Sequence, residues 1–140
     1  MTGLSSCVFK ITSHVINLDE NGKPDGEIEK DEFTAKGKVG RREGTTLLSY
    51  EEKRDGASVS CEILIKDDEV KVLRRGDVIS EMVFAVGKTH ESVYRVPPFS
   101  FDMKISTSRI ENDEASLALF YEMSVGGAEK RCRMKIERLD

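Results

Sequence analysis

The feature that most constrains the fold is an alternation of apolar and polar side chains with a period of two, which runs along most of the chain. Residues 116–125 show it clearly, and the apolar members of a second run are Val59, Cys61, Ile63 and Ile65. Successive side chains of a β-strand point to opposite faces, so this period is typical of strands with one buried face. The sequence therefore predicts an all-β fold, with residues 110–114 as the one segment weighed as a short helix.

Turn sequences recur at intervals of roughly 8–12 residues, as expected of an all-β sandwich or barrel. The links are mostly short, so consecutive strands are expected to pair as antiparallel hairpins. A sheet of this kind keeps two unpaired edges unless it closes. We therefore predict an up-and-down antiparallel barrel of about 8–10 strands, calycin- or lipocalin-like, whose first and last strands pair. The expected strands are Cys7–Asn17, Glu27–Val39, Thr45–Glu52, Ser58–Lys66, Glu69–Arg74, Val78–Val86, Thr89–Val96, Phe99–Ser108, Ala115–Val125 and Glu129–Leu139.

Length, charge and cysteine content narrow the class of protein. The chain has 140 residues, which predicts one domain over residues 1–140. Its net charge of −4 argues against nucleic-acid binding by the chain as a whole. Three widely spaced cysteines, Cys7, Cys61 and Cys132, are expected to be reduced thiols. No apolar run approaches the ~18 residues of a membrane helix and no leader is recognisable before Cys7, so a cytoplasmic protein without membrane association is expected.

Several longer segments carry a family resemblance through their order and spacing. They are residues 48–52 (LSYEE), 63–76 (ILIKDDEVKVLRRG), 82–87 (MVFAVG) and 119–123 (LFYEM), together with Ile105, Thr107 and Gly126. Together they resemble the YwiB-like family, which implies a calycin-like β-barrel from a Gram-positive-type bacterium and a family without an assigned activity. The resemblance supplies no catalytic or binding residue. The chain departs from the family pattern at Pro98-Phe99-Ser100, where a glycine is expected after the aromatic residue.

Three short motif fragments fail on their spacing. Residues 21–32 resemble a calcium-binding EF-hand loop, but Lys23 stands where an oxygen ligand is needed. Residues 87–89 lack the first glycine of a phosphate-binding loop, and Tyr94 stands where a zinc-protease motif starting at His90 needs its second histidine. No nucleophile, base and orienting group stand together. The sequence thus predicts no metal, no cofactor and no catalytic residues, and it argues against an enzyme.

Aromatic and methionine side chains are concentrated on the faces expected to point inward. A barrel of this size either fills its interior with side chains or holds one small ligand. Buried tyrosines need hydrogen-bond partners, which a ligand or water can supply. Arg74 shares the face of Val70 and Val72, so it is expected either to reach the anionic head group of a ligand or to lie in solvent at a hairpin end. The candidate ligand-binding residues are Tyr50, Arg74, Met82, Phe84, Tyr94, Phe101, Met103 and Tyr121, and the alternative is that they form a packed core.

The last expected strand carries cations on the face opposite its apolar residues. If this strand pairs with the first, these cations join Lys10 and His14 in an outer basic stripe, whose members are Lys10, Arg131, Arg133 and Lys135. Such a stripe either binds phosphates or is a solvated face that discourages edge pairing. Three functions stay open: a barrel that binds a small hydrophobic or amphipathic ligand, an interaction module such as a homodimer, and an RNA-associated protein that uses the stripe.

Overall fold

Ten antiparallel strands make up the computed structural model of the chain, which describes residues 4–54 and 56–139. The strands are β1 (Ser5–Asn17), β2 (Glu29–Arg42), β3 (Thr45–Arg54), β4 (Ala57–Ile65), β5 (Val70–Gly76), β6 (Ser80–Phe84), β7 (Thr89–Val96), β8 (Phe99–Asn112), β9 (Ser116–Val125) and β10 (Ala128–Arg138). No helix occurs within these described ranges. The predicted all-β architecture is confirmed.

The segment weighed as a short helix, residues 110–114, is instead a strand end followed by a turn. β8 continues to Asn112, and the side chain of Asp113 then accepts hydrogen bonds from the amides of Ala115 and Ser116, both 2.9 Å long. An aspartate that bonds to nearby backbone amides offers the chain an alternative to a helix. The sequence analysis did not take into account that the Asp113 side chain competes with helix formation for these backbone amides.

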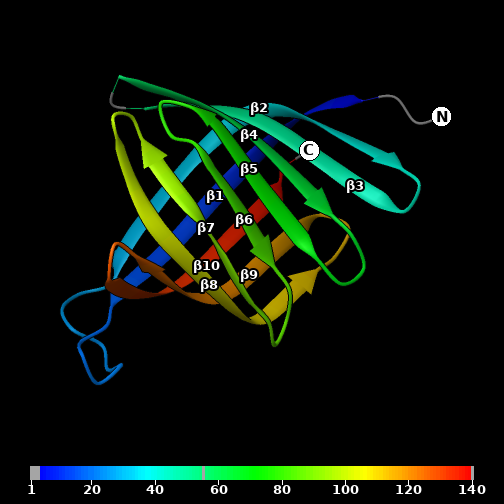
Figure 1. Cartoon of the computed structure of the whole chain (residues 1–140). Coiled ribbons are helices and arrows are strands. Elements are labelled where there is room, and N and C mark those ends of the chain that lie inside the picture. Colours follow the sequence, from blue (N-terminus) through cyan, green and yellow to red (C-terminus); the bar gives the residue numbers. More distant parts are fainter. Residues whose placement is uncertain (1–3, 55, 140) are drawn as a thin grey trace.

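The strands form one barrel wall, because β1 pairs with β10 as well as with β2. The β1–β10 ladder runs from Phe9 opposite Arg138 to Asn17 opposite Lys130, and the two strands lie side by side in Figure 1 (blue and red). The predicted pairing of the first and last strands is confirmed. Around the wall the order is β6-β5-β4-β3-β2-β1-β10-β9-β8-β7, so the two ends of the sheet meet at β6 and β7.

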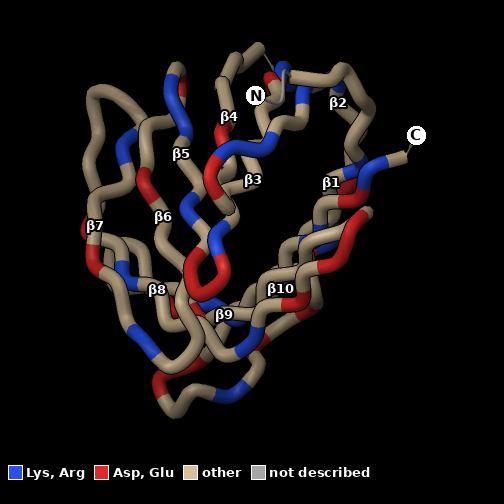
Figure 2. The backbone as a smooth tube through the Cα atoms, turned by 90° about the vertical axis from the view of Figure 1, so that its right-hand side faces the viewer, with Lys and Arg blue, Asp and Glu red and all other residues tan. Residues whose placement is uncertain are grey.

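Closure between β6 and β7 is incomplete. Their ladder is a single bridge, in which the amides of Ile79 and Arg95 each donate to the other residue's carbonyl oxygen at 2.9 Å. We call this β6–β7 boundary the seam. Figure 2 shows β6 and β7 next to each other on one side of the barrel, with β1 and β2 on the opposite side. The barrel is therefore nearly closed.

The inner face of the barrel holds an apolar core to which all strands except β7 contribute buried residues. Phe9 is 1% exposed, and Phe84 is fully buried with its ring 4.8 Å, centroid to centroid, from the ring of Tyr121. Burying a large apolar side chain contributes roughly 1.5–3 kcal/mol, and an edge-to-face ring pair adds about 0.5–1.5 kcal/mol. The core is therefore the main source of stability and the scaffold on which any site is built.

Gly37 of β2 shows how closely the strands approach one another. A Cβ atom at this position would lie 2.1 Å from the carbonyl oxygen of Ser49 and 2.9 Å from the ring of Phe9. Such a close approach is a recognised reason for glycine inside a strand. Gly37 therefore leaves room for the Phe9 ring, whose centroid is 6.2 Å from that of Tyr50 in the core.

Candidate functional site

The eight residues predicted to line the interior differ in how deeply the structure buries them. Five of them are buried, with at most 8% of the residue exposed: Tyr50, Met82, Phe84, Met103 and Tyr121. Tyr94 is partly buried and Phe101 is 41% exposed. Arg74 of β5 lies between Cys61 of β4 and Ser80 of β6 on the inner face. A role for these residues in ligand binding stays a prediction.

A cavity of about 760 Å³ opens at the end of the barrel where β2 joins β3 and β8 joins β9. We call it the mouth cavity. Its floor consists of buried core residues, namely Phe9, Leu48, Ile65, Leu117 and Ile136. Its rim is polar and includes Arg41, Asn112, Asp113, Glu114, Ser116 and Arg138. An apolar floor with a few polar groups, at this size and at the mouth of a barrel, is typical of a small-molecule site.

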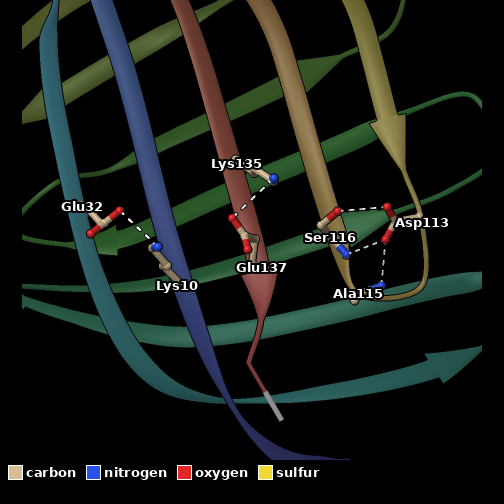
Figure 3. A network of polar contacts seen from close by, with 7 residues as sticks. All are labelled: Lys10, Glu32, Asp113, Ala115, Ser116, Lys135 and Glu137. Carbon is tan, nitrogen blue, oxygen red and sulfur yellow. Dashed lines mark hydrogen bonds and ion pairs between the residues drawn. The ribbon is translucent and has the colours of Figure 1, made fainter.

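Asp113 fixes the shape of this rim. Besides the two backbone amides, the hydroxyl of Ser116 donates a hydrogen bond of 3.1 Å to its carboxylate (Figure 3). The amide of Ala115, followed by the hydroxyl and amide of Ser116, holds the pKa of Asp113 below its usual range. The carboxylate therefore stays charged at neutral pH and keeps the β8–β9 link in place beside the cavity.

The eight predicted residues do not line the mouth cavity. The sequence analysis selected aromatic and methionine side chains, whereas four of the five floor residues are aliphatic. The signal that could have found them was positional, because inward-facing residues near strand ends line the mouths of a barrel. Thr46, for example, has the inward parity of Leu48 and stands two residues closer to the strand end.

A second feature lies on the strands that flank the seam. Four buried side-chain atoms have no hydrogen-bond partner among the described residues: Arg74 Nε, Ser80 Oγ, Ser92 Oγ and Thr107 Oγ1. We call these four residues the seam cluster. They lie on β5, β6, β7 and β8 in turn, two strands on each side of the seam. A buried polar group left unpaired costs about 1–3 kcal/mol. Arg74 and Ser80 face each other across β5 and β6, whereas Thr107 lies beside Val86, beyond the other end of β6.

Arg74 is the only charged member of the seam cluster. Within the described ranges it forms no ion pair, and Glu52, a carboxylate that acts on its charge, is paired with Arg54 at 3.5 Å. Burial by itself lowers the pKa of Arg74, but Cys61, Tyr50 and Glu52 raise it by more, and the net shift is upward. The interior of the barrel therefore holds a positive charge without a carboxylate in direct contact.

Two tyrosine–cysteine pairs adjoin this charge. Tyr50 faces Cys61 across β3 and β4, and Tyr121 faces Cys132 across β9 and β10. Burial raises the pKa of both tyrosines, and it raises the pKa of Cys132 to about 11. The hydroxyls and thiols are therefore neutral at physiological pH, and none of them supplies a counter-charge to Arg74.

On the outer surface, the predicted basic stripe is largely neutralised. Three of its residues form ion pairs. Figure 3 shows Lys10 with Glu32 at 3.4 Å and Lys135 with Glu137 at 3.4 Å. The third is Arg131 with Glu122 at 3.1 Å. Arg133 forms none among the described residues and lies 5.3 Å from the ring centroid of Phe120. Figure 2 likewise shows acidic and basic residues interspersed along the strands. Phosphate binding by the stripe stays a prediction.

An outer groove of about 560 Å³ crosses β8, β9, β10 and β1 beside this stripe. Its lining includes His14, Phe120 and Arg133. The charged side chains Glu122 and Arg131, which also line it, are paired with each other. The groove therefore presents less free charge than the sequence pattern of the stripe indicates.

The fold and the mouth cavity define a nearly closed β-barrel with an apolar-floored opening at one end. Residues 16–136 match the protein-family model described as a domain of unknown function (DUF1934), and the chain belongs to this family. It is 28% identical over 124 residues to the uncharacterized β-barrel protein YwiB of Bacillus subtilis (strain 168), a match that covers 86% of this chain and 85% of the relative. The resemblance drawn from the sequence is confirmed.

A solved structure shares the fold. The crystal structure of the ywiB protein from Bacillus subtilis superposes with a TM-score of 0.71 at 22% sequence identity, covering 96% of this chain and 94% of that chain. Within residues 4–54 and 56–139, no cluster of three or more His, Cys, Asp or Glu side chains is arranged to hold a metal ion. The same residues include no helix long and apolar enough to cross a membrane.

Proposed function

We propose that this protein binds a small amphipathic ligand inside the barrel, with the apolar part of the ligand in the mouth cavity. The observation that carries the proposal is the cavity itself, about 760 Å³ with a floor of core side chains. Leu117 and Ile136 are each 2% exposed and still line it, so the cavity reaches the core rather than lying on the surface. Apolar surface at this depth favours an apolar ligand over water.

The rim favours a ligand with one polar end. Arg41 and Arg138 supply positive charge there, and Asp113 and Glu114 supply negative charge. A polar head group therefore finds both donors and acceptors where the cavity meets solvent. Drug-sized and lipid-like ligands are held in cavities of roughly 300–1,000 Å³, and the mouth cavity lies within this range.

The proposal is tested with anilinonaphthalene sulfonate, a fluorescent amphipathic anion, and decanoate as a competitor. We expect saturable fluorescence enhancement that decanoate reverses, while near-ultraviolet circular dichroism shows that the fold is intact. The decisive variant is Thr46→Trp, because Thr46 lines the cavity and pairs with Ile65 on its floor. A tryptophan there fills part of the cavity without replacing a core residue.

The matched control is Thr45→Trp, one residue earlier on β3 and on the opposite face of the strand. We expect Thr46→Trp to weaken probe and decanoate binding by at least about tenfold, which corresponds to about 1.4 kcal/mol. Thr45→Trp is expected to leave both unchanged. Absence of saturable binding, or equal affinity in the two variants, would contradict the proposal.

The structure gives less support to the other two functions. The ion pairs of Lys10, Arg131 and Lys135 leave the stripe with little unpaired charge for RNA. A homodimer stays a prediction that light scattering measures directly. We therefore favour the interior site.

A further inference from the structure

We propose that Arg74 and Ser80, the two adjacent members of the seam cluster, form a second, separate binding site, which takes a small oxyanion such as a carboxylate or a phosphate group. The proposal starts from the four unpartnered atoms on β5 to β8. Within the described residues these four are the complete set of buried side-chain atoms that lack a partner, and none lies on the opposite wall of the barrel. Arg74 and Ser80 face each other across β5 and β6, so their two unpartnered atoms belong to neighbouring side chains on the inner face.

The site is distinct from the mouth cavity. Thr46 and Ile65, which line the cavity, face each other across β3 and β4, and Ile65 faces Val70 of β5. Arg74 stands four residues further along β5, roughly 13 Å away at about 3.3 Å per residue. Its strand neighbours are Cys61 and Ser80 near the other end of the barrel.

The chemistry of the cluster selects the ligand. A guanidinium only donates hydrogen bonds, and its planar shape matches the paired oxygens of a carboxylate or phosphate. Ser80 is 5% exposed and presents a hydroxyl donor from β6 beside Arg74. The hydrogen-bond donors here surround the positive charge of Arg74. They are best matched by a negatively charged acceptor, and an oxyanion is such an acceptor.

No carboxylate among the described residues forms an ion pair with Arg74. Glu52 faces the interior from β3, but it is bound to Arg54, which also binds Asp31. Tyr50 and Tyr121 are neutral, as shown above, and so act on Arg74 as dipoles. Ser80 directly follows Ile79, whose bridge to Arg95 is the one ladder contact between β6 and β7 among the described residues, so the proposal requires this bridge to open for a ligand to enter.

The test is calorimetric titration of the full chain with sodium acetate, inorganic phosphate and sulfate in turn, at pH 7 and at an ionic strength fixed with chloride. We expect saturable binding of at least one oxyanion, accompanied by a rise in the melting temperature. Arg74→Met is expected to abolish both effects. Arg75→Met, which changes the exposed neighbour on the other face of β5, is expected to retain them. The three titrants distinguish a carboxylate site from a phosphate or sulfate site.

Two further variants keep the proposal testable if Arg74→Met fails to fold. Ser80→Ala removes the hydroxyl beside Arg74 and is expected to weaken oxyanion binding by about 3–10-fold. Thr107→Val removes an unpartnered hydroxyl beside Val86 and is expected to leave oxyanion binding unchanged. Thr46→Trp, the variant that fills the mouth cavity, is also expected to leave it unchanged, so the two proposals fail independently. No saturable binding of any of the three anions, or undiminished binding in Arg74→Met or in Ser80→Ala, would overturn the inference.

Discussion

The wall made by β9, β10, β1 and β2 and the wall made by β5 to β8 use the same kind of strand, yet they satisfy their polar groups differently. Along the first wall the ladders are continuous, with β1 paired over long stretches to β10 and β2. Along the second, the ladder breaks at the seam. All four unpartnered buried side-chain atoms of the described residues lie on the second wall.

This difference shows in which part of the barrel wall buried polar side chains lack a partner that a bound ligand could supply. The continuous wall presents aliphatic side chains such as Ile11, Leu119 and Ile136 to the core, each at most 4% exposed. Close packing of that kind leaves no buried side-chain polar atom unpaired among the described residues of this wall, and the proposed amphipathic ligand meets the wall only at the mouth cavity, where Leu117 and Ile136 form part of the floor. The seam wall instead buries Arg74 Nε and three hydroxyl oxygens that have no hydrogen-bond partner among the described residues. The proposed oxyanion would supply a partner for Arg74 and Ser80.

The largest expected effect is on the continuous wall. Leu119→Ala removes a fully buried side chain of β9, which pairs with both β8 and β10. We expect the free energy of unfolding, measured by urea denaturation, to fall by about 3–4 kcal/mol because transfer and cavity costs add. Glu122→Ala on the outer face of the same strand serves as the control, with an expected loss below about 1 kcal/mol. Similar losses in the two variants would remove the basis of the comparison.

The next effect is a difference in local opening between the walls. Amide hydrogen exchange is expected to be at least about 100-fold faster for β6 and β7 amides that face the seam than for central β1–β10 amides such as Ile11. The physical reason is that seam amides rely on one bridge, whereas Ile11 lies inside ladders on both sides. Uniform protection around the barrel would mean that the seam is closed in solution.

A smaller effect compares two adjacent hydroxyl residues of β8. The hydroxyl of Thr107 has no hydrogen-bond partner in residues 4–54 and 56–139, whereas that of Ser106 lies 2.9 Å from the Thr89 hydroxyl. In oxyanion-free buffer, Thr107→Val is expected to leave the free energy of unfolding unchanged or raise it by up to about 2 kcal/mol, because an unmet polar group is removed. Ser106→Ala is expected to lower it by up to about 1 kcal/mol. A loss above about 1 kcal/mol in Thr107→Val would show that its hydroxyl is satisfied.

The smallest effect depends on pH and lies at the surface near the first wall. The hydrogen bond from Arg54 lowers the pKa of Asp31 below its usual value of 3.8. A lowered folded-state pKa means that the pair stabilises the fold above pH 3.8, and that this stabilisation is lost as the pH falls through the folded-state value. Because Asp31 is half-exposed, we expect Asp31→Asn to cost less than about 1 kcal/mol at pH 7 and nothing near pH 2.

The control for the pH experiment is Glu81→Gln on the outer face of β6, since Glu81 forms no ion pair among the described residues. Urea denaturation at a series of pH values measures both variants against the parent chain. A stability difference for Asp31→Asn that stays constant down to pH 2 would show that the Arg54 pair does not titrate as described.

Much of the fold could be predicted because alternation is a local signal. The period of two in residues 59–65 and 116–125 specifies strands and their buried faces without any knowledge of partners. The pairing of the first and last strands followed from the need to remove sheet edges. The strand bounds were less accurate, as at β8, which runs to Asn112 because Asp113 starts the turn there.

The candidate sites could be predicted only in part, because they depend on where the barrel stays open. Arg74 stood out as a charge on an apolar face, but Ser80 and Thr107 carry no such signal, since small hydroxyl residues are ordinary on strands. The ion pairs that largely neutralise the outer basic stripe could not be predicted from the sequence either. Its ion pairs follow from strand register, which places Arg131 opposite Glu122, and register is not visible in the sequence of one strand.

The most direct test of the central claim is a nuclear magnetic resonance titration of the methyl-labelled protein with decanoate below its micelle concentration. The account predicts saturable shift changes at the methyl groups of Leu48, Leu117 and Ile136, which form the floor of the mouth cavity. Leu47 and Leu64 lie on the outer faces of β3 and β4 and are expected to stay unchanged. Unchanged floor methyl groups, or shifts confined to Leu47 and Leu64, would contradict ligand binding in the barrel.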